Sequence, residues 1–151
     1  MDYWDCLSKY CIYSLQRRRE RYLIIYTWKI LEGLVPNPVI NNRNSSGNFI
    51  ECYYSQRLGR FCRVPTLNSI SSNRIKTLKF NSFHVNSCRL FNSLPMSIRN
   101  ISDCTVDNFK MFLDRFLCSV PDYPHLPSLR KFCPTTSNSL ISVLEWQGQL
   151  N

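Results

Sequence analysis

The stretch "SLQRRRERYLIIYTWKILEG", residues 14–33, decides how the first third of the chain folds. Four arginines fall within five positions, and ten mostly large and apolar residues follow them directly. Ser14 can cap the start of a helix, Gly33 suits the left-handed position that follows one, and Pro36 prevents continuation. The pattern predicts one helix over 14–32. Its first half is expected to be solvent-exposed on most sides, and its second half is expected to be buried nearly all round.

The charged and apolar halves of this helix allow three interpretations. A membrane anchor is excluded, because the apolar run is ten residues long and contains Lys29, whereas a span needs about 20 apolar residues. Two interpretations stay open. Either the arginines bind nucleic acid from the end of a buried helix, or they are a solvated helix end that pairs with Glu20 and other surface acids.

The rest of the chain is also mostly helical in pattern. Apolar residues at helical spacing and Ser, Thr, Asn or Asp caps predict further helices at about 2–12, 82–94 and 105–119. Residues 51–80 alternate aromatic, β-branched and basic side chains, which predicts an extended segment with a small β-hairpin. Turn-forming residues predict a loop at 36–51. The expected fold class is mainly α with a small β-hairpin (α+β), a helical module with an extended loop.

The last thirty residues differ from the rest in composition. Four prolines fall between residues 121 and 134, and polar residues follow. Such a composition predicts a mostly disordered tail over 121–151, with one turn of helix at 139–146. The domain expectation is therefore a basic helical module at 1–120 and a proline-rich tail at 121–151, within the length of a single domain.

Positive charge is concentrated in the middle of the chain. The net charge is +9, yet between Glu51 and Asp103 there are eight basic residues and no acidic residue. Nearly the whole excess therefore belongs to one third of the sequence. A polyanion is the natural partner of such a segment.

No catalytic or metal-binding pattern accompanies this charge. The sequence has no adjacent acids, no C-x-x-C, and two histidines isolated from any cysteine pair. It thus predicts no metal site, no cofactor and no enzymatic activity. The eight cysteines are irregularly spaced and no secretory signal precedes them. Free thiols in a reducing compartment are expected, which places the chain inside the cell, in the nucleus or the cytoplasm.

Several motifs follow one another along the chain: "RRRERYLIIYTWKILEGLVPN" (17–37), "GRFCRVP" (59–65), "SFHVNSCRLFNSLPMSIRN" (82–100) and "FKMFLDRFLCSVPDYP" (109–124). In their order and spacing they resemble the C-terminal part of reverse transcriptases encoded by non-LTR (LINE-type) retrotransposons. The resemblance covers residues 3–142. Members of that family polymerise DNA with palm carboxylates and nick target DNA with an N-terminal endonuclease, and this chain has neither motif. The resemblance therefore implies a non-catalytic fragment from behind the polymerase thumb.

The leading hypothesis is sequence-nonspecific binding to the backbone of RNA or DNA in the parent polyprotein. The residues expected to contact phosphates are Arg17, Arg18, Arg19, Arg21, Arg57, Arg60, Arg63, Arg74, Lys76 and Lys79. Aromatic side chains of the 51–80 segment, Tyr53, Tyr54 and Phe61, are candidates for stacking on single-stranded bases.

A second hypothesis belongs to a different class. A fragment cut from its polymerase would expose apolar surface on helices that once packed against the thumb. The chain would then be a retroelement relic with no selected activity, or a scaffold for protein interactions, and it would self-associate through that surface.

Overall fold

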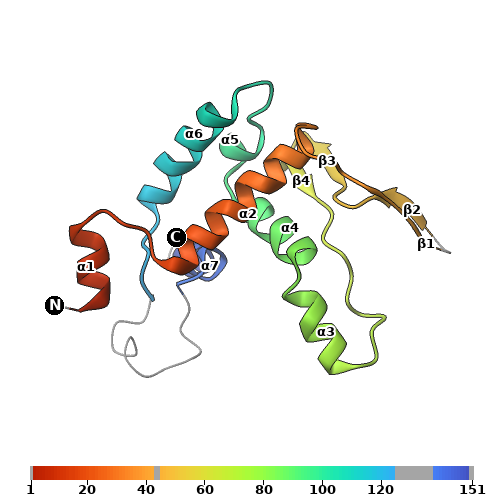
Figure 1. Cartoon of the computed structure of the whole chain (residues 1–151), viewed down its shortest axis with the longest axis horizontal. Helices are drawn as coiled ribbons and strands as arrows, with labels where there is room; N and C mark the ends of the chain where they lie inside the picture. Colours follow the sequence, from red (N-terminus) through yellow and green to blue (C-terminus); the bar gives the residue numbers. More distant parts are fainter. Residues whose placement is uncertain (1, 43–44, 125–137, 150–151) are drawn as a thin grey trace.

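The computed structural model describes residues 2–42, 45–124 and 138–149, and within them the chain is mainly α (Figure 1). The helices are α1 (Tyr3–Lys9), α2 (Leu15–Leu31), α3 (Asn73–Phe80), α4 (Phe83–Ser93), α5 (Met96–Arg99), α6 (Val106–Ser119) and α7 (Leu140–Gln149). Two antiparallel hairpins pair β1 (Val39–Asn42) with β2 (Ser45–Asn48) and β3 (Cys52–Ser55) with β4 (Gly59–Cys62). The expected fold class, mainly α with small β-hairpins, is confirmed.

Helix α2 begins and ends where its sequence predicts. The Ser14 hydroxyl accepts a hydrogen bond from the backbone N–H of Arg17 at 3.1 Å, which caps the first turn. After the helix, Gly33 has a φ of +73°, a conformation that glycine adopts without steric cost. The capping residues therefore set the length of the longest helix in the described chain.

The core lies where α2 packs against α4 and α6 (Figure 1). Trp28 of α2 is fully buried, and its ring stacks on that of Phe109 of α6 with centroids 4.4 Å apart and an interplanar angle of 7°. The indole Nε1 donates a hydrogen bond to the Ile101 carbonyl at 2.8 Å, so this large side chain buries no unpaired donor. Stacking and hydrogen bond together fix α6 against α2.

The start of each partner helix also follows from its cap. The Ser82 hydroxyl accepts from the Val85 N–H at the start of α4, and the Thr105 hydroxyl accepts from the Asn108 N–H at the start of α6. Both helices therefore form over the residues predicted for them. The hairpin expected within 51–80 is also present, as β3 and β4.

Three local predictions need correction. Residues 74–80, expected to be extended, belong to helix α3, where the Thr77 hydroxyl donates to the Asn73 carbonyl at 2.9 Å. Arg, Lys and Leu favour helix, and in so short a segment alternation of bases and apolar residues does not exclude it. The 36–51 segment, expected to be a loop, contains the β1–β2 hairpin, and α5 was not expected at all.

Helix α7 joins the same core as the helices before residue 120. Leu140 and Val143 are buried in the cluster that contains Trp28 and Phe109. Only one helical turn was expected here, at 139–146, within a mostly disordered tail. Two buried apolar residues one turn apart explain why this part of the tail packs. Residues 125–137 of the expected tail lie outside the described residues.

None of the helices in the described ranges has the length and hydrophobicity that a membrane span requires. The cysteines within the described residues are free thiols: Cys6, Cys11, Cys52, Cys62, Cys88, Cys104 and Cys118.

The stack of Trp28 on Phe109 predicts a large loss of stability when the phenylalanine is truncated. Phe109→Ala should lower the free energy of unfolding by about 3–5 kcal/mol, because it opens a cavity in the core. Phe112→Ala, on the same helix but 39% exposed, should cost about 1 kcal/mol or less. Urea denaturation measures both values, and equal losses would contradict the packing described for α6.

Candidate nucleic-acid interface

The arginine run at the start of α2 points in several directions. Successive residues of a helix are rotated by about 100°, so four arginines in five positions cannot share one face. Arg17 is fully buried, Arg21 is half-buried, and Arg18 and Arg19 are exposed. The run divides into a structural part and a solvent-facing part.

Arg17 belongs to the structural part. Its Nη2 donates to the Pro121 carbonyl at 2.9 Å, and its Nε lies 3.8 Å from the Glu20 Oε2 and 3.8 Å from the Asp122 Oδ1. Burial lowers the pKa of Arg17, and the carboxylates of Asp122 and Glu20 partly oppose that shift. The prediction that Arg17 contacts phosphates from an exposed turn is therefore wrong, because its charge is enclosed by acids and backbone.

The carboxylates around Arg17 connect distant parts of the chain. Glu20 accepts a hydrogen bond from the Leu140 N–H at 2.9 Å, which ties the start of α7 to α2. Asp122 accepts from both the N–H and the hydroxyl of Ser14, at 2.6 and 2.7 Å. Burial raises the pKa of Glu20, and the hydrogen bonds it accepts together with the charge of Arg17 oppose that shift. We call Ser14, Arg17, Glu20 and Asp122 the buried charge cluster.

Arg21 is neutralised in a different way. Its Nε and Nη2 donate to the two carboxylate oxygens of Asp114 at 2.6 and 2.7 Å, a bidentate pair that links α2 to α6 and raises the pKa of Arg21. Arg18 donates only to the Tyr13 carbonyl, at 2.9 Å, and stays exposed. Among the described residues, Arg18 and Arg19 form no ion pair. These two are the arginines of the run available to a ligand.

The bases of the β3–β4 hairpin are partly occupied as well. Arg60 is half-buried, and its Nη1 lies 2.8 Å from the Glu32 Oε1 and 3.1 Å from the Ile101 carbonyl oxygen. Arg63 is exposed but lies 3.4 Å from the Glu51 carboxylate, and Arg57 is exposed in the turn. The hairpin therefore offers fewer free charges than its sequence predicts.

The predicted stacking residues of the hairpin are exposed to different degrees. Tyr54 is 70% exposed and Tyr53 is 43% exposed. The Tyr53 ring lies 5.9 Å from that of Phe61 across the hairpin, and its hydroxyl donates to the Glu51 carboxylate at 2.9 Å. A carboxylate beside Tyr53 disfavours a phosphate there.

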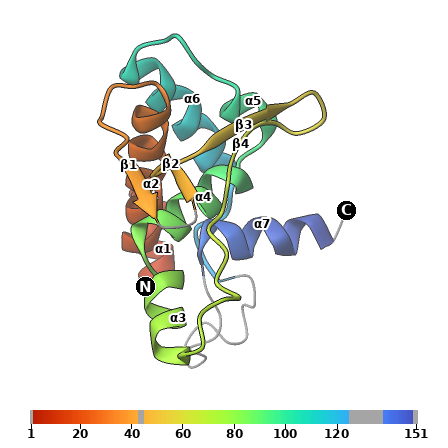
Figure 2. The same cartoon turned by 90° about the vertical axis from the view of Figure 1, so that its right-hand side faces the viewer.

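Helix α3 carries the clearest group of free cations. It has no buried residue, and Arg74, Lys76 and Lys79 are all exposed and form no ion pair within the described chain. Figures 1 and 2 show α3 extending from the core at the end opposite to α5 and the β3–β4 turn. Residues 51–80 were expected to be one extended segment, but their bases lie in two separate elements, the β3–β4 hairpin and α3.

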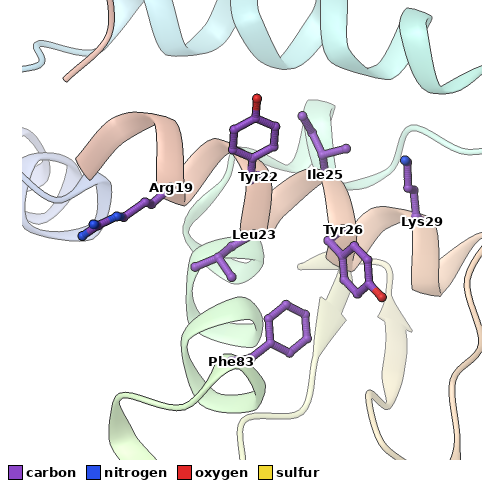
Figure 3. Close-up of a pocket in the computed structure, with 7 residues that line it drawn as sticks. All are labelled: Arg19, Tyr22, Leu23, Ile25, Tyr26, Lys29 and Phe83. Carbon is purple, nitrogen blue, oxygen red and sulfur yellow. The ribbon is translucent and has the colours of Figure 1, made fainter. Parts of the chain in front are cut away.

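A groove that sequence reasoning missed runs along the outer face of α2. It has a volume of about 660 Å³, and Figure 3 shows the side chains that line it. Its lining is Arg19, Tyr22, Leu23, Ile25, Tyr26, Lys29 and Phe83, which we call the α2 groove. Tyr22 is 67% exposed and Tyr26 46% exposed, so the second half of α2 is not buried on all sides as predicted. Tyr22 and Tyr26 are four residues apart, a spacing that could have revealed one shared face.

No cluster of three or more metal-ligating side chains occurs within the described residues. His84 packs its ring against Phe49 with centroids 4.3 Å apart, and burial lowers its pKa. This histidine has the environment of a packed side chain at the edge of the core.

No protein-family model, curated protein or solved structure matches the chain. The exposed charges, the aromatic side chains and the contacts described above are therefore the observations from which a function is inferred.

The two classes of arginine predict opposite results on substitution. Arg17→Met should lower the free energy of unfolding by about 3–5 kcal/mol, because it leaves Glu20 and Asp122 without their buried counter-charge. Arg18→Met, on the exposed side of the same turn, should change it by about 1 kcal/mol or less. Urea denaturation at neutral pH compares the two, and a stable Arg17→Met protein would show that the buried charge cluster is not structural.

Proposed function

We propose that the chain binds the backbone of RNA or DNA without reading its sequence. We further propose that it is a non-catalytic C-terminal module of a LINE-type reverse transcriptase. The observation that carries the binding proposal is helix α3, with its three exposed bases and no acid among them. Exposed cations without acidic partners contribute to binding by releasing the counterions of phosphates.

Among the exposed cations that form no ion pair within the described chain, two groups each lie close together on one helix. Arg18 and Arg19 lie on α2, and Arg74, Lys76 and Lys79 lie on α3. Nothing in the segment from residue 52 to residue 102 opposes them, since it contains no acidic residue. Contacts between these cations and phosphates need no particular base, so we expect affinity for both RNA and DNA.

The motifs of the resemblance supply much of the core, which supports treating them as parts of one inherited unit. The "RRRERYLIIYTWKILEGLVPN" motif (17–37) contributes Trp28, and the "FKMFLDRFLCSVPDYP" motif (109–124) contributes Phe109, the residue on which Trp28 stacks. The same two motifs contribute Arg21 and Asp114, which form the bidentate pair between α2 and α6. Descent from a polymerase does not require polymerase activity in this module.

The binding proposal predicts a specific dependence on salt. Five exposed cations that neutralise four or five phosphates give a slope of log affinity against log salt of about −3 to −5. Fluorescence anisotropy with a labelled oligonucleotide measures this slope. Affinity that does not change with salt, or no binding at low salt, would refute the proposal.

Neutralising α3 should remove most of this dependence. The triple variant R74Q/K76Q/K79Q should reduce the magnitude of the slope by about 2–3, which corresponds to three lost phosphate contacts. The control variant K9Q/K110Q/R115Q removes the same charge from α1 and α6, on the other side of the molecule (Figure 1), and should reduce it much less. An equal effect of the two variants would show that net charge, and not α3, determines binding.

One observation favours the second hypothesis, a scaffold for protein interactions. Helix α3 also exposes apolar side chains, with Ile75 50%, Leu78 65% and Phe80 41% exposed. In a parent polyprotein such a face would pack against another module, and in the isolated chain it would promote self-association.

Sedimentation velocity tests this second function. It predicts association that increases with protein concentration and is abolished by I75Q/L78Q, because these changes remove the apolar face and leave all three bases in place. A monomer at every concentration would contradict it. A relic with no selected activity also predicts self-association through exposed apolar surface, but no salt-dependent binding of nucleic acid.

A further inference from the structure

The α2 groove combines an apolar floor with a cation at each end. Figure 3 shows Arg19 at one end of the row of side chains and Lys29 at the other, with the rings of Tyr22, Tyr26 and Phe83 between them. No acidic residue lines it. Within the described chain, neither Arg19 nor Lys29 forms an ion pair. The groove thus presents both positive charge and uncovered aromatic surface.

Two aromatic side chains of the groove, Tyr26 and Phe83, belong to a row of contacting rings. The Tyr26 ring contacts that of Phe83 edge-on, with centroids 5.6 Å apart and an interplanar angle of 83°. Phe83 in turn lies parallel to Phe49, with centroids 6.2 Å apart. This row supports the ring of Tyr26 from one side. The Tyr26 side chain is still 46% exposed, and that of Tyr22 is 67% exposed. A supported but exposed ring is a platform on which a flat ligand can stack.

The length of the groove limits the size of its ligand. Arg19 and Lys29 are ten residues apart on one helix, which corresponds to about 15 Å. A strand with stacked bases advances about 3.4 Å per nucleotide, so the two cations are separated by about four nucleotide steps. A ligand that alternates flat apolar groups with regularly spaced negative charges can place its flat groups on the apolar floor and its charges at Arg19 and Lys29.

We infer that the α2 groove binds single-stranded RNA or DNA, with bases stacked on Tyr22 and Tyr26 and phosphates held by Arg19 and Lys29. This inference rests on the proposed function and deepens it, because it names a single strand as the preferred ligand. In a duplex, the faces of the bases already stack on each other and are not available to tyrosine rings. An apolar peptide would cover the rings but leave both cations without a partner.

The charge of α3 continues from the groove. Helix α3 ends at Phe80, three residues before Phe83, and places Lys79 next to that end. A strand that leaves the groove past Phe83 therefore meets the exposed bases of α3. The C-terminal end of α3 is therefore three residues along the chain from Phe83, which lines the groove.

The test compares two oligonucleotides of equal charge. One is a fluorescein-labelled oligothymidine of about twelve nucleotides, and the other is its abasic analogue, with the same number of phosphates and no bases. Wild-type protein should bind the oligothymidine more tightly than the abasic strand by at least about 5- to 150-fold, the range expected for one stacked base, because two bases are expected to stack. Both affinities are measured by fluorescence anisotropy at the same salt concentration.

Variants of the groove separate stacking from charge. Y22A/Y26A should lose most of the preference for bases while binding the abasic strand as wild type does, and Y22F/Y26F should keep the preference. The matched control is Y3A/Y10A, which removes two exposed tyrosines from α1 and its C-cap and should leave the preference unchanged. A further variant, Y53A/Y54A, tests the hairpin tyrosines that the sequence suggested for stacking. Because Y22F/Y26F keeps the rings, it remains informative even where Y22A/Y26A folds poorly.

Each outcome of these binding measurements refutes a different claim. No binding to the abasic strand would refute the proposed function, whereas equal binding to the two strands would refute only the stacking inference. Loss of the preference in Y53A/Y54A would move the stacking site to the hairpin and overturn the assignment to α2. Self-association that Y22A/Y26A abolishes would also overturn it, because the groove would then be occupied by a second copy.

Discussion

A single buried guanidinium, that of Arg17, lies where three parts of the chain meet. It contacts Glu20 within α2, and it contacts Pro121 and Asp122 in the segment after α6. Through Glu20 the same cluster reaches the start of α7, more than one hundred residues away in sequence. An uncompensated charge in this position would be costly, so the fold depends on these partners remaining together. The negative charges of Glu20 and Asp122 are therefore balanced by Arg17, and they do not oppose the binding of a polyanion to other parts of the surface.

This use of acids determines which positive charges face solvent. Glu20 and Asp122 enclose Arg17, Asp114 binds Arg21, and Glu32 binds Arg60. The bases of α3 have no such partner within the described chain, and neither does Arg19 at the entrance to the α2 groove. Within the described chain, α3 thus carries three exposed bases without an acidic partner, and α2 carries Arg18 and Arg19. Exposed tyrosines lie on the same face of α2, which makes that face chemically suited to a single strand.

Local signals predicted the long elements well. Ser14, Ser82 and Thr105 are caps that can be recognised in the sequence, and the helices they begin are present. Helix α3 was missed because seven or eight residues of mixed character satisfy both periodicities, and α3 packs no side chain that would decide between them. Helix α7 was underestimated because its stability comes from burying Leu140 and Val143 against distant helices, which composition does not reveal.

The candidate site was also only partly predictable, because it too depends on contacts between residues that are far apart in the sequence. Sequence identified Arg19 and the bases of α3, yet it could not tell Arg17 from Arg18, since their difference depends on Asp122 and Pro121, more than one hundred positions later. It also predicted that the second half of this helix would be buried nearly all round, although Tyr26 there is 46% exposed and Tyr22 just before it 67% exposed. Nuclear magnetic resonance of the ¹⁵N-labelled protein, titrated with oligothymidine, tests the central claim most directly. The account predicts that the amide signals that shift belong to residues 19–29 of α2, to α3 and to Phe83. Shifts confined to α6, α1 or the β3–β4 hairpin, or no shifts at all, would contradict it.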